Sequence, residues 1–74
     1  MMKIVITGAL GYLGTELCKL YSGESRFKNI VAVDNRFVSG RVSQLRDWGV
    51  DFVQASILDE ETIKEIVSDA DVVI

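Results

Sequence analysis

The sequence predicts an α/β protein with a parallel sheet, arranged as part of a doubly wound fold. Two observations carry this prediction. Short runs rich in Val and Ile alternate with stretches in which apolar residues recur at helical spacing. Strands of a parallel sheet are buried on both faces and are therefore continuously apolar. With right-handed crossovers between them, four such strands give a three-layer α/β/α arrangement with the strand order 3-2-1-4.

The expected strands are short apolar runs, and they cover residues 3–7, 29–34, 51–55 and 70–74. Gly8 stops the first strand, and Asp34 is the last residue of the second. In the predicted order the fourth strand lies at an edge of the sheet, where unpaired backbone groups invite pairing with another chain. We therefore expect self-association through the fourth strand.

The first helix is expected over residues 12–21. Its apolar residues at helical spacing are Leu13, Leu17, Leu20 and Tyr21. We expect these side chains to face the sheet, with Glu16 and Lys19 on the opposite face of the helix. The turn-forming residues 22–25 end it.

The second and third helices are expected to be shorter. After a loop over residues 37–40, residues 42–48 are expected to form a helix that turns Leu45 and Trp48 toward the core. The third helix opens with consecutive acids, which the helix dipole favours in a first turn. Asp59 is expected to be its N-cap. The apolar stripe of this helix consists of Ile63, Ile66 and Val67.

The composition excludes several classes of protein. The 74 residues carry 8 Lys and Arg against 11 Asp and Glu, a formal net charge of −3, which argues against a basic nucleic-acid surface. No apolar run approaches the ~18 residues that a transmembrane helix needs. Histidine is absent and Cys18 is the only cysteine, so we expect no metal site, no internal disulfide and no cysteine nucleophile. A reducing, cytoplasmic compartment is the expected location.

Three glycines lie between the first strand and the first helix, in the run Thr-Gly-Ala-Leu-Gly-Tyr-Leu-Gly over residues 7–14. Gly8 can adopt the positive φ of a tight strand-to-helix turn. Gly11 removes a side chain where the backbone would approach a pyrophosphate, whose charge would meet the free N–H groups at a helix start. Gly14 lets the helix lie close against the strand. A tight turn without a ligand would use the same glycines, so the motif alone leaves both interpretations open.

Asp34 ends the second strand 20 residues after Gly14. A carboxylate at that place can accept hydrogen bonds from both hydroxyls of an adenosine ribose. By itself, Asp34 could equally be a solvated acid at a strand end. Together with the glycine turn it favours nucleotide binding. No Gly-Lys-Ser/Thr follows the glycines, which excludes a P-loop phosphotransferase.

The Thr-Gly-x-x-Gly-x-x-Gly spacing, followed by Val33-Asp34-Asn35, resembles the amino terminus of extended short-chain dehydrogenases/reductases. Within them it is most similar to NAD-dependent epimerase/dehydratases that act on sugar nucleotides. The resemblance covers the whole chain, but only about the first quarter of such a protein. It implies a Rossmann fold with NAD as the cofactor.

The resemblance also implies which residues hold the cofactor. The main chain of Tyr12 and Leu13 would contact the pyrophosphate, and Asp34 would hold the ribose and favour NAD over NADP. Where the family often has an aspartate at the adenine, this chain has Ser56, so a weaker or rearranged adenine contact is expected. The full set of expected cofactor-binding positions is Gly8, Gly11, Tyr12, Leu13, Gly14, Asp34, Asn35, Ser39, Ser56 and Ile57. Arg36 and Arg41 are expected to be solvated, although Arg36 could reach a phosphate on the adenosine.

The catalytic pair of that family is missing from the sequence. Its base is the tyrosine of a Tyr-x-x-x-Lys pair, whereas Tyr12 is followed four residues later by Glu16 and Tyr21 by Ser25. We therefore expect no catalytic residue in the chain, and the catalytic and substrate-binding portions would lie beyond Ile74.

Residues 1–74 are accordingly expected to be the amino-terminal half of an NAD(P)-binding Rossmann domain. They would be the NAD-binding segment of a sugar-nucleotide epimerase/dehydratase-like oxidoreductase, which transfers hydride at a sugar carbon. The alternative is a stand-alone, non-catalytic module for nucleotide binding or interaction.

Overall fold

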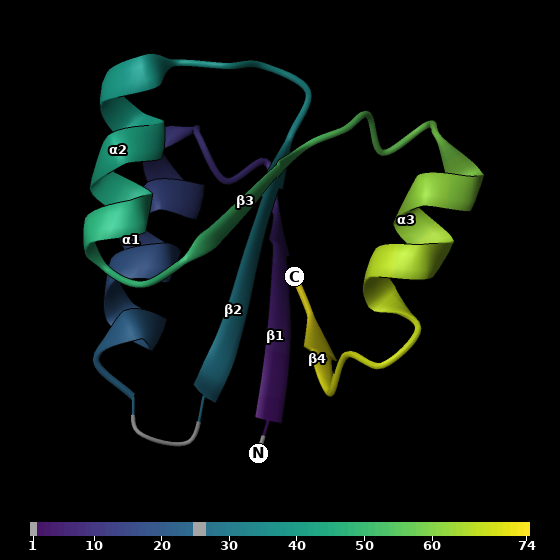
Figure 1. The fold of residues 1–74 in the computed structure, drawn as a ribbon, viewed down its shortest axis with the longest axis horizontal. Coiled ribbons are helices and arrows are strands. Elements are labelled where there is room, and N and C mark those ends of the chain that lie inside the picture. Colours follow the sequence, from purple (N-terminus) through teal and green to yellow (C-terminus); the bar gives the residue numbers. More distant parts are fainter. Residues whose placement is uncertain (1, 25–26) are drawn as a thin grey trace.

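The computed structural model describes residues 2–24 and 27–74. In chain order the elements are β1 (Met2–Thr7), α1 (Tyr12–Ser22), β2 (Phe27–Asp34), α2 (Ser39–Asp47), β3 (Asp51–Gln54), α3 (Glu60–Val67) and β4 (Val72–Val73). The strands form one parallel sheet in the order β3-β2-β1-β4 (Figure 1). Both the parallel sheet and the predicted strand order are confirmed.

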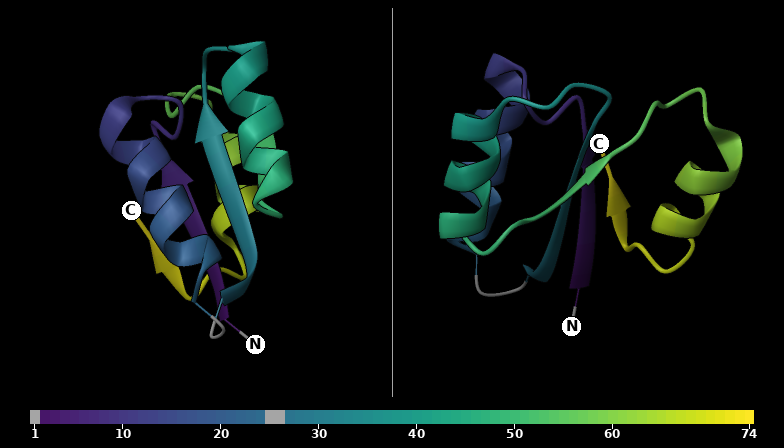
Figure 2. Two further views of the ribbon diagram at one scale, coloured as in Figure 1. Left: turned by 90° about the vertical axis from the view of Figure 1, so that its left-hand side faces the viewer. Right: turned by 45° about the horizontal axis from the view of Figure 1, so that its top comes forward.

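The sheet separates two apolar cores, which makes the fold three-layered. The helices α1 and α2 cover one face of the sheet and α3 covers the other (Figures 1 and 2). Successive residues of a strand point to opposite faces, so Ile4 and Ile6 of β1 face α1 and α2, while Val5 faces α3. The core beside α3 joins Val5, Val31 and Val33 to the partly buried stripe Ile63, Ile66 and Val67. The predicted stripe of the third helix is thereby confirmed.

The orientation of α1 differs from the prediction. Leu13 and Leu20 are 70% and 61% exposed, whereas Gly14 and Cys18 are buried. Leu17 and Tyr21 pack against the core as expected. Leu17 and Tyr21 can be buried together either with Leu13 and Leu20 or with Gly14 and Cys18. The close approach of Gly14 to the preceding turn places the second set against the sheet.

The second helix begins earlier than predicted. It starts at Ser39 rather than at residue 42, so the predicted loop over residues 37–40 is wrong in its second half. The backbone N–H groups of Arg41 and Val42 both donate to the carbonyl of Val38, which closes the first turn. Leu45 is fully buried, and Trp48 packs against the core from the C-cap position, as expected.

The remaining differences concern element ends. The first two strands begin earlier than predicted, at Met2 and Phe27. The third strand ends at Gln54, and the fourth is confined to Val72–Val73. The end of α1 falls one residue later than predicted, and residue 25 of the expected turn lies outside the described residues. Among the described residues, no helix combines the length and the apolar character needed to cross a lipid bilayer.

Candidate functional site

The carboxyl ends of β1, β2 and β3 meet at one edge of the sheet, and a hollow of about 410 Å³ opens there. Its lining consists of Thr7, Gly8, Val33, Asp34, Asn35, Ala55, Ser56, Ile57 and Leu58. Doubly wound proteins bind their ligands outside the carboxyl ends of the strands, where the strand order reverses. In this sheet the reversal lies at β1, because β2 and β4 flank it. The hollow therefore lies at the carboxyl edge where this fold binds ligands, next to the reversal and on its β2 side.

The glycine turn that follows β1 is tightly folded. Gly8 has a φ of +63°, the left-handed region in which glycine is at ease, so the predicted role of Gly8 is confirmed. The backbone N–H of Ala9 donates to the carbonyl of Val33, which ties the turn to the end of β2. The N–H of Gly11 donates back to the carbonyl of Gly8 at 3.1 Å.

Gly14 explains how α1 can lie so close to this turn. A Cβ at Gly14 would stand only 2.3 Å from the carbonyl oxygen of Gly8 and 2.7 Å from the Cα of Ala9. No side chain fits there without moving the backbone. The expected role of Gly14 in close packing is confirmed.

Gly11 is the N-cap of α1 and offers no side chain to cap the helix. The first N–H groups of a helix have no partner within it, and the helix dipole gives this end a partial positive charge. The main chain of Tyr12 and Leu13 belongs to this first turn, while their side chains are 84% and 70% exposed. The start of α1 is therefore able to receive an anion.

Asp34 ends β2 and is buried, with 5% of its surface exposed. Its Oδ2 accepts a hydrogen bond from the backbone N–H of Leu10 in the glycine turn at 2.9 Å. Its Oδ1 accepts from the backbone N–H of Arg36 at 3.0 Å. The guanidinium of Arg36 also donates to both carboxylate oxygens, each at 3.1 Å. Mainly through these side-chain bonds, Arg36 lowers the pKa of Asp34 to about 2.

Both arginines near the site are exposed, as expected, but each also bonds to the protein. Arg36 forms the ion pair with Asp34 described above. The guanidinium of Arg41 donates to the carbonyl of Leu10, which links α2 to the glycine turn. A guanidinium presents several N–H donors in one plane, so that of Arg36 is suited to bind both carboxylate oxygens of Asp34.

The structure brings together only part of the predicted set of site residues. Gly8, Asp34, Asn35, Ser56 and Ile57 line the same hollow. Gly11 and Gly14 do not line the hollow, but both contact Gly8, which does. The first turn of α1 follows directly after Gly11. Ser39 lies at the start of α2, exposed and outside the lining. Contact of any of these residues with a cofactor stays a prediction.

Two features of the site were missed in the sequence. Thr7, Val33, Ala55 and Leu58 also line the hollow, and their position at or just beyond strand ends was a signal that could have found them. The Asp34–Arg36 pair was the second feature, for which an arginine two residues after the strand-ending acid was the available signal. Ser56 has a local task as well, since its hydroxyl oxygen accepts from the N–H of Leu58 at 3.1 Å.

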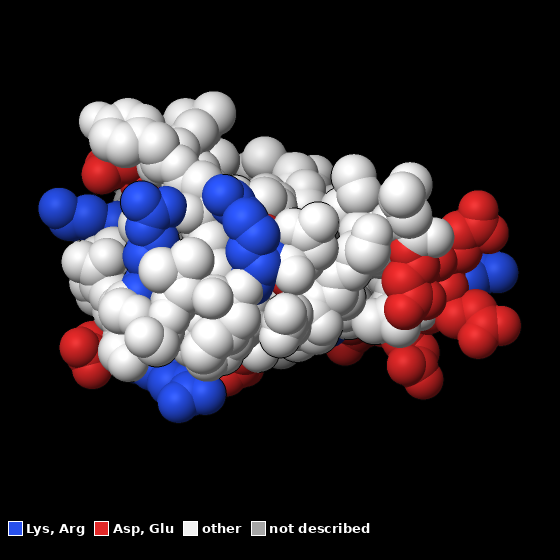
Figure 3. Space-filling model, turned by 90° about the horizontal axis from the view of Figure 1, so that it is seen from above, with Lys and Arg blue, Asp and Glu red and all other residues white. Residues whose placement is uncertain are grey.

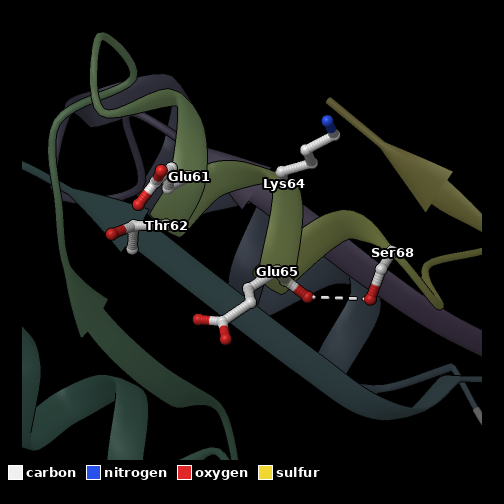
Figure 4. A pocket seen from close by; sticks show the side chains of 5 residues that line it. All are labelled: Glu61, Thr62, Lys64, Glu65 and Ser68. Carbon is white, nitrogen blue, oxygen red and sulfur yellow. Dashed lines mark hydrogen bonds between the residues drawn. The ribbon is translucent and has the colours of Figure 1, made fainter.

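A second and larger hollow, of about 610 Å³, lies on α3, away from the glycine turn. Its lining residues Glu61, Thr62, Lys64, Glu65 and Ser68 come from consecutive turns of this one helix and its C-cap, and they splay outward (Figure 4). Seen from above, acidic groups gather over the α3 end of the molecule, and basic groups gather over the opposite end (Figure 3). An anionic cofactor is therefore not expected on α3.

The described residues contain neither a cluster of metal ligands nor a reactive thiol. Within residues 2–24 and 27–74, no group of three or more His, Cys, Asp or Glu side chains could hold a metal ion. Cys18, on the inner face of α1, is buried in the core, and burial raises the pKa of its thiol to about 11. A thiol held protonated in this way is a poor nucleophile.

Several known proteins are similar to this chain. The probable pinoresinol-lariciresinol reductase 3 of Arabidopsis thaliana is 36% identical over 72 residues, which are 97% of this chain and 23% of the reductase. The structure of L-threonine dehydrogenase from Clostridium difficile matches with a TM-score of 0.80 at 32% identity, over 99% of this chain and 23% of that protein.

The dTDP-glucose 4,6-dehydratase of Bacillus anthracis, solved in complex with NAD, shares the fold with a TM-score of 0.78 at 21% identity. This match covers 97% of this chain and 24% of the dehydratase. The chain thus spans about a quarter of the length of these relatives. The model of the 3-beta hydroxysteroid dehydrogenase/isomerase family matches residues 5–74, so the chain belongs to that family, and its resemblance to extended short-chain dehydrogenases/reductases is confirmed.

Proposed function

We propose that this chain binds NAD at the carboxyl edge of its sheet, as the NAD-binding segment of an oxidoreductase. The observation that carries the proposal is the placement of Asp34. Its buried carboxylate lies at the end of β2 and borders the hollow beside the glycine turn. A carboxylate at this place in a doubly wound fold is suited to accept the hydroxyls of an adenosine ribose.

The predicted cofactor residues divide into two groups in this proposal. The uncapped start of α1, with Gly11, Tyr12 and Leu13, holds the pyrophosphate through main-chain N–H groups. Asn35, Ser56 and Ile57 hold the adenosine in the hollow, together with Asp34. Ser39 lies in the next helix and contacts the cofactor only at the margin of the site.

The charge of Asp34 favours NAD over NADP, because a 2′-phosphate would meet a carboxylate that stays ionised at neutral pH. Calorimetric titration of both cofactors into the full-length protein tests this preference. Tighter binding of NAD is expected, and Asp34→Asn should remove most of the difference. Asp51→Asn, a matched change at the exposed start of β3, should leave the difference intact. Equal or tighter binding of NADP to the wild-type protein would overturn the preference.

For the whole protein we propose reversible hydride transfer at a sugar carbon of a nucleotide sugar. When bound, NAD supplies the hydride acceptor, and the residues of this chain bind and orient it. The support is the glycine spacing together with the match to the family. An activity panel of nucleotide sugars, 3-hydroxysteroids and lignans tests the substrate class. Turnover of only the latter two would overturn the sugar assignment, and NAD binding without any turnover would favour the non-catalytic module.

We also propose a cytoplasmic location and self-association of the isolated segment through β4. A lone buried cysteine suits a reducing compartment, and microscopy of a fluorescent fusion tests the location.

The support for self-association is the edge position of β4, which pairs with β1 on one side. Val73 and Ile74 are 53% and 43% exposed, and an open apolar edge favours pairing with a second chain.

A further inference from the structure

We propose that Arg36 occupies the ribose-binding face of Asp34 in the free protein, and that a dinucleotide binds by displacing its guanidinium. This inference rests on the proposed function. It assigns Arg36 a role in both affinity and specificity: a competitor of the ribose hydroxyls of NAD, and a partner for a 2′-phosphate.

The first argument is that the carboxylate of Asp34 is already saturated. An ionised carboxylate has about four lone-pair positions. Asp34 accepts four hydrogen bonds, from the N–H of Leu10 and from the N–H, Nε and Nη2 of Arg36. The two hydroxyls of a ribose need two of these positions. Two of the present donors must therefore leave before the ribose can bind.

The second argument identifies which donors can leave. The N–H of Leu10 belongs to the glycine turn and to a fully buried residue, and the N–H of Arg36 is fixed by the backbone after β2. The guanidinium, in contrast, belongs to a side chain that is 57% exposed and free to rotate into solvent. Its Nε and Nη2 occupy two positions, which equals the number that a ribose diol requires.

The third argument concerns access. The side chain of Asp34 is only 3% exposed although it borders the hollow. The guanidinium also extends toward the glycine turn, since a Cβ at Gly11 would stand 3.7 Å from Nη2 of Arg36. Arg36 thus bridges the carboxylate at the end of β2 and the glycine turn. Once displaced, its charge stays beside the ribose, where a 2′-phosphate would be placed.

This arrangement predicts opposite effects on the two cofactors. Exposed ion pairs contribute little, so the competition by Arg36 is modest. Arg36→Ala should tighten NAD binding about two- to fivefold, because the binding-competent carboxylate is then always free. The same variant should weaken NADP binding at least about fivefold, because a guanidinium no longer neutralises the 2′-phosphate.

The test is calorimetric titration of the full-length protein with NAD and NADP. Arg46→Ala is the matched control, because Arg46 lies in the last turn of α2, at the end remote from the site. It should change both affinities by a similar small factor. Weaker NAD binding by Arg36→Ala, or unchanged affinities for both cofactors, would overturn the inference while leaving NAD binding itself intact. Failure of the wild-type protein to bind either cofactor would overturn the proposed function as well.

A spectroscopic measurement on the wild-type protein removes any dependence on the stability of a variant. The Nε–H resonance of Arg36, identified by its loss in Arg36→Ala, should be protected from solvent exchange in the free protein. Saturating NAD should abolish that protection. Retention of the protected resonance in the NAD complex would show that the ion pair persists, and the displacement would be refuted.

Discussion

Gly11 lies between the glycine turn and the first turn of α1, where the pyrophosphate of NAD is proposed to bind. A side chain at Gly11 should interfere with NAD binding more than with folding. A Cβ at Gly11 would stand 3.3 Å from the carbonyl oxygen of Gly8, tighter than ordinary contact, while its φ of −74° suits any residue. Gly11→Val should therefore leave the strands formed. It should weaken NAD binding at least about 100-fold, because the branched side chain takes the space of the pyrophosphate.

Calorimetry together with circular dichroism checks this prediction. Gly40→Val is the control, since a Cβ at Gly40 meets nothing within 4 Å. If Gly11→Val binds NAD with unchanged affinity, the glycines form only a turn.

Asp34 should also make the stability of the fold depend on acid pH. Its folded pKa is about 2, below the ordinary value of 3.8. A lowered pKa contributes stability that is present above pH 3.8 and lost as the pH falls toward 2. The contribution should be less than about 2 kcal/mol, because water screens the exposed guanidinium of Arg36.

Urea unfolding at several pH values measures this contribution. The difference in unfolding free energy between the wild-type protein and Asp34→Asn should shrink between pH 4 and pH 2. A difference that is the same at both pH values would show that the charge of Asp34 does not stabilise the fold.

Among the elements, α3 is stabilised at both of its ends as well as by its apolar stripe. Its apolar residues Ile63, Ile66 and Val67 are only partly buried. At its start, Asp59 accepts hydrogen bonds from the N–H and the hydroxyl of Thr62, at 3.3 and 2.9 Å, which confirms the predicted N-cap. At its other end, Nζ of Lys3 donates to the carbonyl of Ile66 and pairs with Asp69. The cap stabilises the first turn of α3, and the Lys3 contacts link its other end to β1.

Loss of the N-cap should therefore destabilise the protein measurably. Asp59→Ala should lower the unfolding free energy by about 1 kcal/mol, the usual contribution of a capping side chain. Asp59→Asn is the control, because asparagine caps helices about as well as aspartate. Denaturant unfolding of both variants measures the effect, and equal losses would assign it to the charge instead of the cap.

Considered as a whole, the sheet has β3 and β4 at its two edges. A polypeptide of residues 1–74 should associate through β4, because its outer edge presents unpaired backbone groups next to exposed Val73. Sedimentation equilibrium over a wide concentration range should show dimers or larger species. Val73→Lys should shift the equilibrium toward monomer, because a lysine on an edge strand opposes pairing. A folded wild-type monomer at every concentration would refute the prediction.

Much of this fold could be predicted from the sequence because its main signals are local. Alternation of β-branched runs with helical spacing determines the order of strands and helices, and the right-handed crossover rule then leaves few ways to arrange a parallel sheet. The glycine turn and the strand-ending Asp34 likewise depend on backbone conformation and on position along the chain. The resemblance to the extended short-chain dehydrogenases/reductases was recognised on the same short motifs.

The remaining features depend on contacts between segments that are distant in sequence. Which stripe of α1 is buried was decided by the approach of Gly14 to Gly8, and two stripes of equal spacing cannot be separated without that contact. The pairing of Asp34 with Leu10 spans 24 residues, and it exists only because β2 ends beside the turn that follows β1. Arg36 could be expected in solvent until the fold placed its donors against that carboxylate. Periodicity and propensity report on one segment at a time, whereas these contacts arise from packing between segments.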